Sequence, residues 1–158
     1  MKKLFLIILT VGLFSIASQA QNYRTGLGAR LGPFNGITLK HFVSESNALE
    51  GIANFRWGGF AITGLYEWQK PISGAAGLDY FLGFGAHVGS YGDHVYWHDQ
   101  YPDRTHFTVF GVDFIAGLEY TFAEVPFNIG LDWKPAYNFG GYHWWGDGLA
   151  LSLRYTFK

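Results

Sequence analysis

The chain has 158 residues, with 11 Lys and Arg against 12 Asp and Glu and a formal net charge of −1. This balance argues against a nucleic-acid-binding protein, which needs clustered basic side chains. The absence of cysteine excludes disulfides and a lipidated N-terminal cysteine. Charged residues make up only 15% of the chain and aromatic residues 20%, whereas an ordinary soluble domain is about a quarter charged. The composition therefore disfavours an ordinary soluble domain.

The first element is a predicted secretory signal peptide over residues 1–20. Lys2 and Lys3 form a basic start, residues 4–16 form an apolar core, and the Ala-Ser-Gln-Ala sequence of residues 17–20 offers small side chains to a signal peptidase. The apolar core is too short for a membrane-spanning helix. We therefore expect residues 21–158 to form the mature protein as a single domain.

Eight stretches of alternating apolar and polar residues follow, and we predict each as a β-strand. They are residues 23–31, 37–43, 48–57, 60–68, 75–88, 106–122, 127–137 and 149–157. Clusters of Gly, Pro, Asn and Ser separate them, as turns require. The two longest interruptions, residues 89–105 and 138–148, fall at the same end of an antiparallel barrel, as in barrels with short turns at one end and long loops at the other.

Each predicted strand has one large apolar face and one face of small or charged residues. The charged residues on the second face are Arg24, Arg30, Lys40, Glu50, Arg56, Glu67, Asp79, Asp113, Glu119, Asp132, Lys134 and Arg154. A soluble lipocalin-like barrel would place the apolar face inside, but an eight-stranded barrel has an interior just wide enough for side chains. We therefore predict an all-β fold, an eight-stranded antiparallel transmembrane barrel of up-and-down topology, with the charges in its lumen.

Most acids of this set lie on the middle strands, whereas most bases lie on the first two strands and the last. Closure of the sheet would bring the acidic and basic walls together across a narrow lumen. Charges removed from water must pair or be neutralised, so one interpretation is an ion-pair network that plugs the barrel. The alternative is an ion pathway through a narrow channel.

The long loops carry aromatic, His and Asp residues that indicate a surface for a glycan or a protein partner. The residues with this potential are Tyr96, Trp97, Tyr101, Tyr142, Trp144 and Trp145. His94, His98, Asp99 and His143 are weak metal candidates, since His and Asp can bind zinc or copper but the spacing of His94 and His98 aligns side chains only on a helix. The alternative is that these residues only pack the loops together. We expect no cofactor.

Catalysis has little support in the sequence. After the predicted signal the serines are Ser44, Ser46, Ser73, Ser90 and Ser152. None of them stands in a pattern that places a histidine as an oriented base, and no phosphate loop or nucleotide fingerprint is present. We therefore expect a protein that is not an enzyme.

The strand pattern resembles that of the small eight-stranded outer-membrane proteins of the OmpA/OmpX type. The last strand ends on an aromatic residue in that family, and Phe157 matches, although Lys158 follows it. The resemblance implies the outer membrane of a diderm bacterium, with outer-membrane lipid, lipopolysaccharide and the outer-membrane assembly machinery as partners. It implies a structural or surface-interaction role in envelope integrity, adhesion or defence. The alternative is a narrow channel or a barrel that binds a small ligand or metal.

Overall fold

The structure is a computed structural model that describes residues 23–56, 59–92, 106–139, 143–146 and 148–157. The strands are β1 (Thr25–Leu31), β2 (Gly36–Phe42), β3 (Asn47–Arg56), β4 (Gly59–Pro71), β5 (Leu78–Gly92), β6 (His106–Thr121), β7 (Phe127–Trp133), β8 (Ala136–Asn138), β9 (Trp144–Trp145) and β10 (Leu149–Phe157). Within these ranges no helix is long and apolar enough to cross a membrane. The predicted signal peptide lies outside the described residues.

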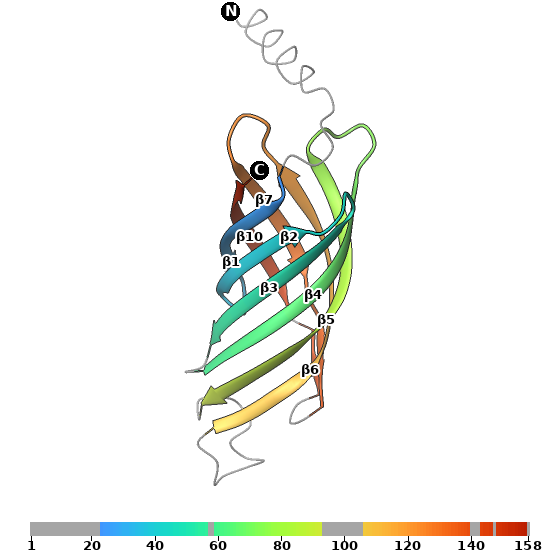
Figure 1. The fold of residues 1–158 in the computed structure, drawn as a ribbon. Coiled ribbons are helices and arrows are strands. Elements are labelled where there is room, and N and C mark those ends of the chain that lie inside the picture. The colour runs from blue at the N-terminus through green and yellow to red at the C-terminus, as the bar shows by residue number, and fades with distance from the viewer. Residues whose placement is uncertain (1–22, 57–58, 93–105, 140–142, 147, 158) are drawn as a thin grey trace, which may run out of the picture.

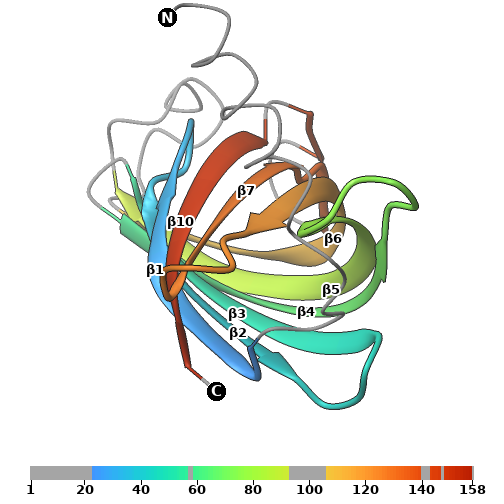
Figure 2. The same ribbon diagram turned by 90° about the horizontal axis from the view of Figure 1, so that it is seen from above.

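The strands form a closed antiparallel barrel, as predicted. β1 to β7 pair in chain order, and β10 pairs with β7 on one side and with β1 on the other, so that Thr25 lies opposite Phe157. β7 and β8 are two parts of one barrel strand along β6, interrupted at Pro135, which has no N–H to donate. The Pro135 carbonyl still accepts a 3.0 Å hydrogen bond from the amide of Phe114. The barrel is therefore eight-stranded (Figures 1 and 2).

Several strand boundaries differ from the sequence prediction; for example, β4 continues to Pro71 rather than ending at residue 68, and β5 continues to Gly92 rather than ending at residue 88. The fifth strand begins at Leu78 rather than at residue 75, because Gly74 and Gly77 adopt φ angles of 86° and 79° and form a turn there. Residues 144–145 form the short strand β9 within a segment predicted as a loop. They pair with Ala136 and Tyr137 of β8. β10 pairs with β7 but does not reach β8, so β9 can pair with the edge of β8 that β10 leaves uncovered.

The register gives the barrel a steep stagger. A path of directly opposed residues runs once around the sheet, through Phe127, Tyr155, Leu27, Leu39, Gly51, Gly64, Ala86, Val112 and Tyr137. The path leaves the β7–β8 strand at Phe127 and returns to it at Tyr137, a shift of 137 − 127 = 10 residues. Such a stagger tilts the strands by roughly 35–45° from the barrel axis. Figure 1 shows the strands running obliquely along the barrel.

The outer and inner faces follow the alternation. Large apolar side chains such as Leu82, Phe84 and Phe114 point outward and are more than half exposed. Charged and small side chains point inward, as expected. A group of four large apolar side chains also points inward, which the sequence prediction did not include. Ile52, Leu65, Phe81 and Ile115 occupy the inward face of β3–β6 and form a buried apolar cluster.

Candidate functional site

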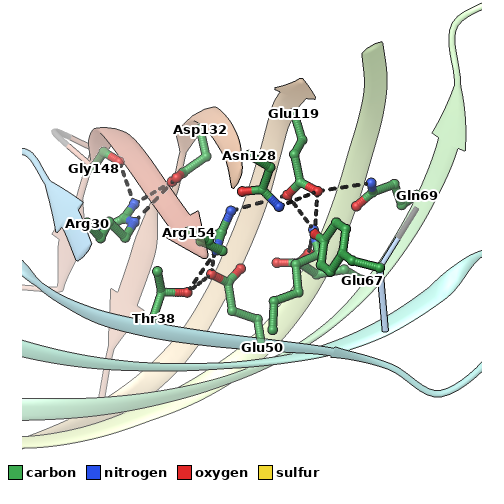
Figure 3. Close-up of polar contacts among 12 residues, drawn as sticks. Arg30, Thr38, Glu50, Glu67, Gln69, Glu119, Asn128, Asp132, Gly148 and Arg154 are labelled. Carbon is green, nitrogen blue, oxygen red and sulfur yellow. Dashed lines mark hydrogen bonds and ion pairs between the residues drawn. The ribbon is translucent and has the colours of Figure 1, made fainter. Parts of the chain in front are cut away.

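The lumen contains the densest group of buried polar side chains, and Arg154 lies at its centre. Arg154 Nη2 donates to Glu50 Oε1 at 2.5 Å, and Arg154 Nη1 donates to Glu119 Oε2 at 3.2 Å. Its Nε donates to Thr38 Oγ1 at 3.3 Å. These partners come from β3, β6 and β2, so one guanidinium on β10 joins several walls of the barrel (Figure 3).

Lys40 is the second cation of this group. Its Nζ lies 2.8 Å from Glu67 Oε2 and 3.3 Å from Glu119 Oε2. The same ammonium lies 4.2 Å from the centre of the Phe81 ring, a favourable cation–π distance. Lys40 is therefore held between two carboxyl groups and the apolar cluster.

Glu119 is the carboxylate with the most donors. Besides Arg154 and Lys40, it accepts hydrogen bonds from the Tyr23 hydroxyl, from Gln69 Nε2 at 3.3 Å and from Asn128 Nδ2 at 3.3 Å. Charge-assisted hydrogen bonds of this kind are stronger than neutral ones. We use the name inner charge layer for five charged residues that are each at most 2% exposed: Lys40, Glu50, Glu67, Glu119 and Arg154.

A separate ion pair joins β1 to β7. Arg30 Nε donates to Asp132 Oδ2 at 3.3 Å, and Arg30 Nη2 donates to Asp132 Oδ1 and, at 3.3 Å, to the carbonyl of Gly148. Two parallel bonds to one carboxylate fix the guanidinium in position. This pair faces the inner charge layer on the β10 side of the lumen (Figure 3).

A third polar group, centred on Asp113, lies on the side of the apolar cluster toward β8. His87 Nδ1 is 2.7 Å from Asp113 Oδ2, and Lys134 Nζ donates to Asp113 Oδ1. His87 Nε2 is 2.8 Å from Asn138 Oδ1, and the Trp145 ring stacks on His87 at 6.1 Å. The adjoining cavity leaves room for about one water molecule.

Most residues predicted for the lumen lie there, but Arg24 and Asp79 do not join these groups. Arg24 is exposed because the chain bends before β1 and directs Tyr23 inward instead. Asp79 is only half-buried and accepts a 2.9 Å hydrogen bond from Gln69 Nε2. Arg56 ends β3, and its side chain lies outside the described residues.

The polar members of the lumen other than Asp, Glu, Lys and Arg were not predicted from the sequence. Tyr23, Thr38, Gln69, His87, Asn128 and Asn138 all make hydrogen bonds within it. Their positions in the alternating pattern could have identified them, because all but Tyr23 lie on the same strand face as the charged residues. A search restricted to charges could not use that signal.

The predicted surface residues are described only in part. Tyr96, Trp97, Tyr101, Tyr142, His94, His98 and Asp99 lie outside the described residues. Trp144 is exposed, as the surface prediction expects, and His143 is also exposed, with its ring 5.8 Å from that of Tyr137. Trp145 instead packs on Phe34, with ring centres 5.3 Å apart. Among the residues that the structure describes, no three His, Asp or Glu side chains gather as a metal site.

A comparison with solved structures identifies the fold. No protein-family model and no curated protein sequence matches the chain. The chain is similar to the N-terminal β-barrel domain of Pseudomonas aeruginosa OprF, with a TM-score of 0.66 and 17% identity over 88% of this chain and 100% of that one. The chain thus has the closed eight-stranded antiparallel fold of the OmpA type.

Proposed function

We propose that the chain is an outer-membrane barrel protein with a non-enzymatic, structural or surface-interaction role and a lumen closed by ion pairs. The observation that carries the proposal is the convergence of buried charges from opposite walls on Arg154 and Glu119. The surface-interaction part rests on Trp144, which is 51% exposed and pairs with Tyr137 at the end of the barrel where β10 begins.

The outer surface supports a place in a membrane. Large apolar side chains cover it along every long strand; for example, Leu39, Leu82 and Leu151 are each about half exposed. Aromatic side chains gather on the outside near the termini, where Phe127 and Tyr155 contact at 5.3 Å. An apolar band with aromatic residues at its edge matches the lipid layer and its interface.

The lumen supports closure rather than conduction. A passage for ions needs water along its whole length, and buried charges that pair with one another leave little room for it. Two groups of buried side chains support closure: the inner charge layer, and the apolar cluster of Ile52, Leu65, Phe81 and Ile115 on the β3–β6 side. The favoured role is therefore a plugged barrel, and the competing role is a narrow channel.

Recording in planar lipid bilayers tests this proposal. We expect the native protein to conduct little, or in rare small steps, and Arg154→Ala to conduct more because the plug loses its central cation. Arg24→Ala is the matched control, since it removes an exposed arginine with the same substitution. A large, steady conductance of the native protein, unchanged in Arg154→Ala, would favour the channel.

Export and assembly follow from the same proposal. We propose that residues 1–20 direct the chain to the outer membrane of a diderm bacterium, with lipid, lipopolysaccharide and the assembly machinery as partners. The exposed final aromatic Phe157, paired with Thr25 at the barrel seam, suits recognition by that machinery. Cell fractionation and N-terminal sequencing test this, and we expect mature protein beginning at Gln21 in the outer-membrane fraction.

A further inference from the structure

The inner charge layer contains more acids than bases. Its carboxyl groups belong to Glu50, Glu67 and Glu119, and its cations are Lys40 and Arg154. The other buried arginine of the described lumen, Arg30, forms an ion pair with Asp132. Tyr23 is a neutral donor to Glu119, and Asp79 is another acid. With every carboxyl group ionised, this sealed layer would hold one unbalanced negative charge, which burial makes costly.

The hydrogen bonds show which carboxyl group lacks donors. Glu119 accepts from five side chains, and Glu50 Oε1 accepts from Thr38 and Arg154. By contrast, Glu50 Oε2 and Glu67 Oε1 are buried and receive no hydrogen bond from any described residue. Lys40 is the ion-pair partner of Glu67. The donor deficit therefore falls on Glu50 and Glu67.

The two deficient side chains lie beside each other. They project inward from the adjacent strands β3 and β4 as diagonal neighbours, because Glu50 lies opposite Leu65 and Glu67 follows two residues later. Long side chains at such positions are close enough to meet. Two ionised carboxylates at this separation repel and offer each other no donor. One proton would supply the missing donor to both groups and would also remove the surplus charge.

We propose that the Glu50–Glu67 pair is a proton-binding site that holds one proton at neutral pH. The proton resides on Glu67, because Arg154 already holds Glu50 as a carboxylate. Two carboxylates, Glu50 and Glu119, then balance Lys40 and Arg154. The titratable and charged groups that face the pair are Tyr23 before β1, Lys40 on β2, Asp79 on β5 through Gln69, Glu119 on β6 and Arg154 on β10.

Infrared spectroscopy of the folded protein in lipid vesicles at pH 7 tests the proposal directly. We expect a carbonyl stretching band of a protonated carboxylic acid in the native protein, and its loss in Glu67→Gln. Asp79→Asn is the control, and it should keep the band because Asp79 lies outside the pair. Absence of the band from the native protein, or its persistence in Glu67→Gln, would overturn the assignment. This readout does not depend on whether the lumen conducts.

Urea unfolding supplies a second readout that needs no spectroscopic assignment. Glu67→Gln and Glu119→Gln make the same change at two fully buried carboxyl groups. A glutamine at 67 can donate to Glu50 as the acid would and still accept from Lys40, so its unfolding midpoint should stay equal or rise. Glu119→Gln should lower the midpoint, because Glu119 stands as a carboxylate among five donors. Equal losses in the two variants would contradict the proposal.

Discussion

Arg154 and Glu50 are 104 residues apart in the sequence, yet Arg154 Nη2 lies 2.5 Å from Glu50 Oε1. β1 and β2 separate their strands in the sheet, so this ion pair spans the lumen rather than neighbouring strands. It ties the last strand of the barrel to the third. The stability of the closed barrel should therefore depend on Arg154.

Removal of Arg154 tests that dependence. We expect Arg154→Ala to lower the free energy of unfolding by about 3–5 kcal/mol, because it leaves the buried carboxylates of Glu50 and Glu119 without their shared partner. Urea titration in detergent or lipid measures the change. Arg24→Ala should shift the midpoint little, since Arg24 is exposed. Similar midpoints for the two variants would show that the cross-lumen pair contributes nothing to stability.

The pair of Arg30 and Asp132 should behave as a coupled unit. Arg30→Met or Asp132→Leu alone leaves one buried charge unpaired and should cost about 3–5 kcal/mol, whereas the double variant removes both charges and should cost less than either change alone. A double-mutant cycle of urea unfolding measures this coupling. Strictly additive losses would mean that the two side chains do not interact in the folded protein.

The outward face can be tested with a single charge. Leu82→Arg places an arginine on the lipid-facing side of β5 and should destabilise the inserted barrel by about 2–4 kcal/mol if the residue lies near the bilayer midplane. Val125→Arg is the matched control, because Val125 is an exposed apolar residue in the β6–β7 turn. The unfolding midpoint of the protein in lipid vesicles should fall in Leu82→Arg and stay near the native value in Val125→Arg. Equal behaviour would contradict the lipid-facing assignment.

The placement of the two barrel ends is testable in cells. Glu45, in the β2–β3 turn, and His143, before β9, are both exposed and lie at opposite ends of the barrel. Because the protein has no cysteine, a cysteine at either position is a unique label. A membrane-impermeant thiol reagent on whole cells should modify His143→Cys and not Glu45→Cys. The reverse pattern would invert the topology.

The alternation of residue types was enough to predict the strands, the closed antiparallel fold and the outward face. It could not predict Tyr23 in the lumen, because a bend at Arg24 interrupts the alternation there. Nor could it assign Arg154 to Glu50, since partners across a lumen depend on the ten-residue stagger of the whole sheet. Phe81 was missed for another reason: its neighbours Gly83 and Gly85 suggested a face without bulk.

The seam between β1 and β10 has a consequence for folding. Arg30 lies on one strand of this seam and Arg154 on the other, while their acidic partners lie on β7, β3 and β6. Before the seam closes, these charges remain hydrated, and they lose water only when the first and last strands meet. The ion pairs that stabilise the closed barrel thus join residues that are far apart in the sequence, and contacts of this kind slow folding. Dehydration of the charges and completion of the sheet should therefore occur in one cooperative, late step.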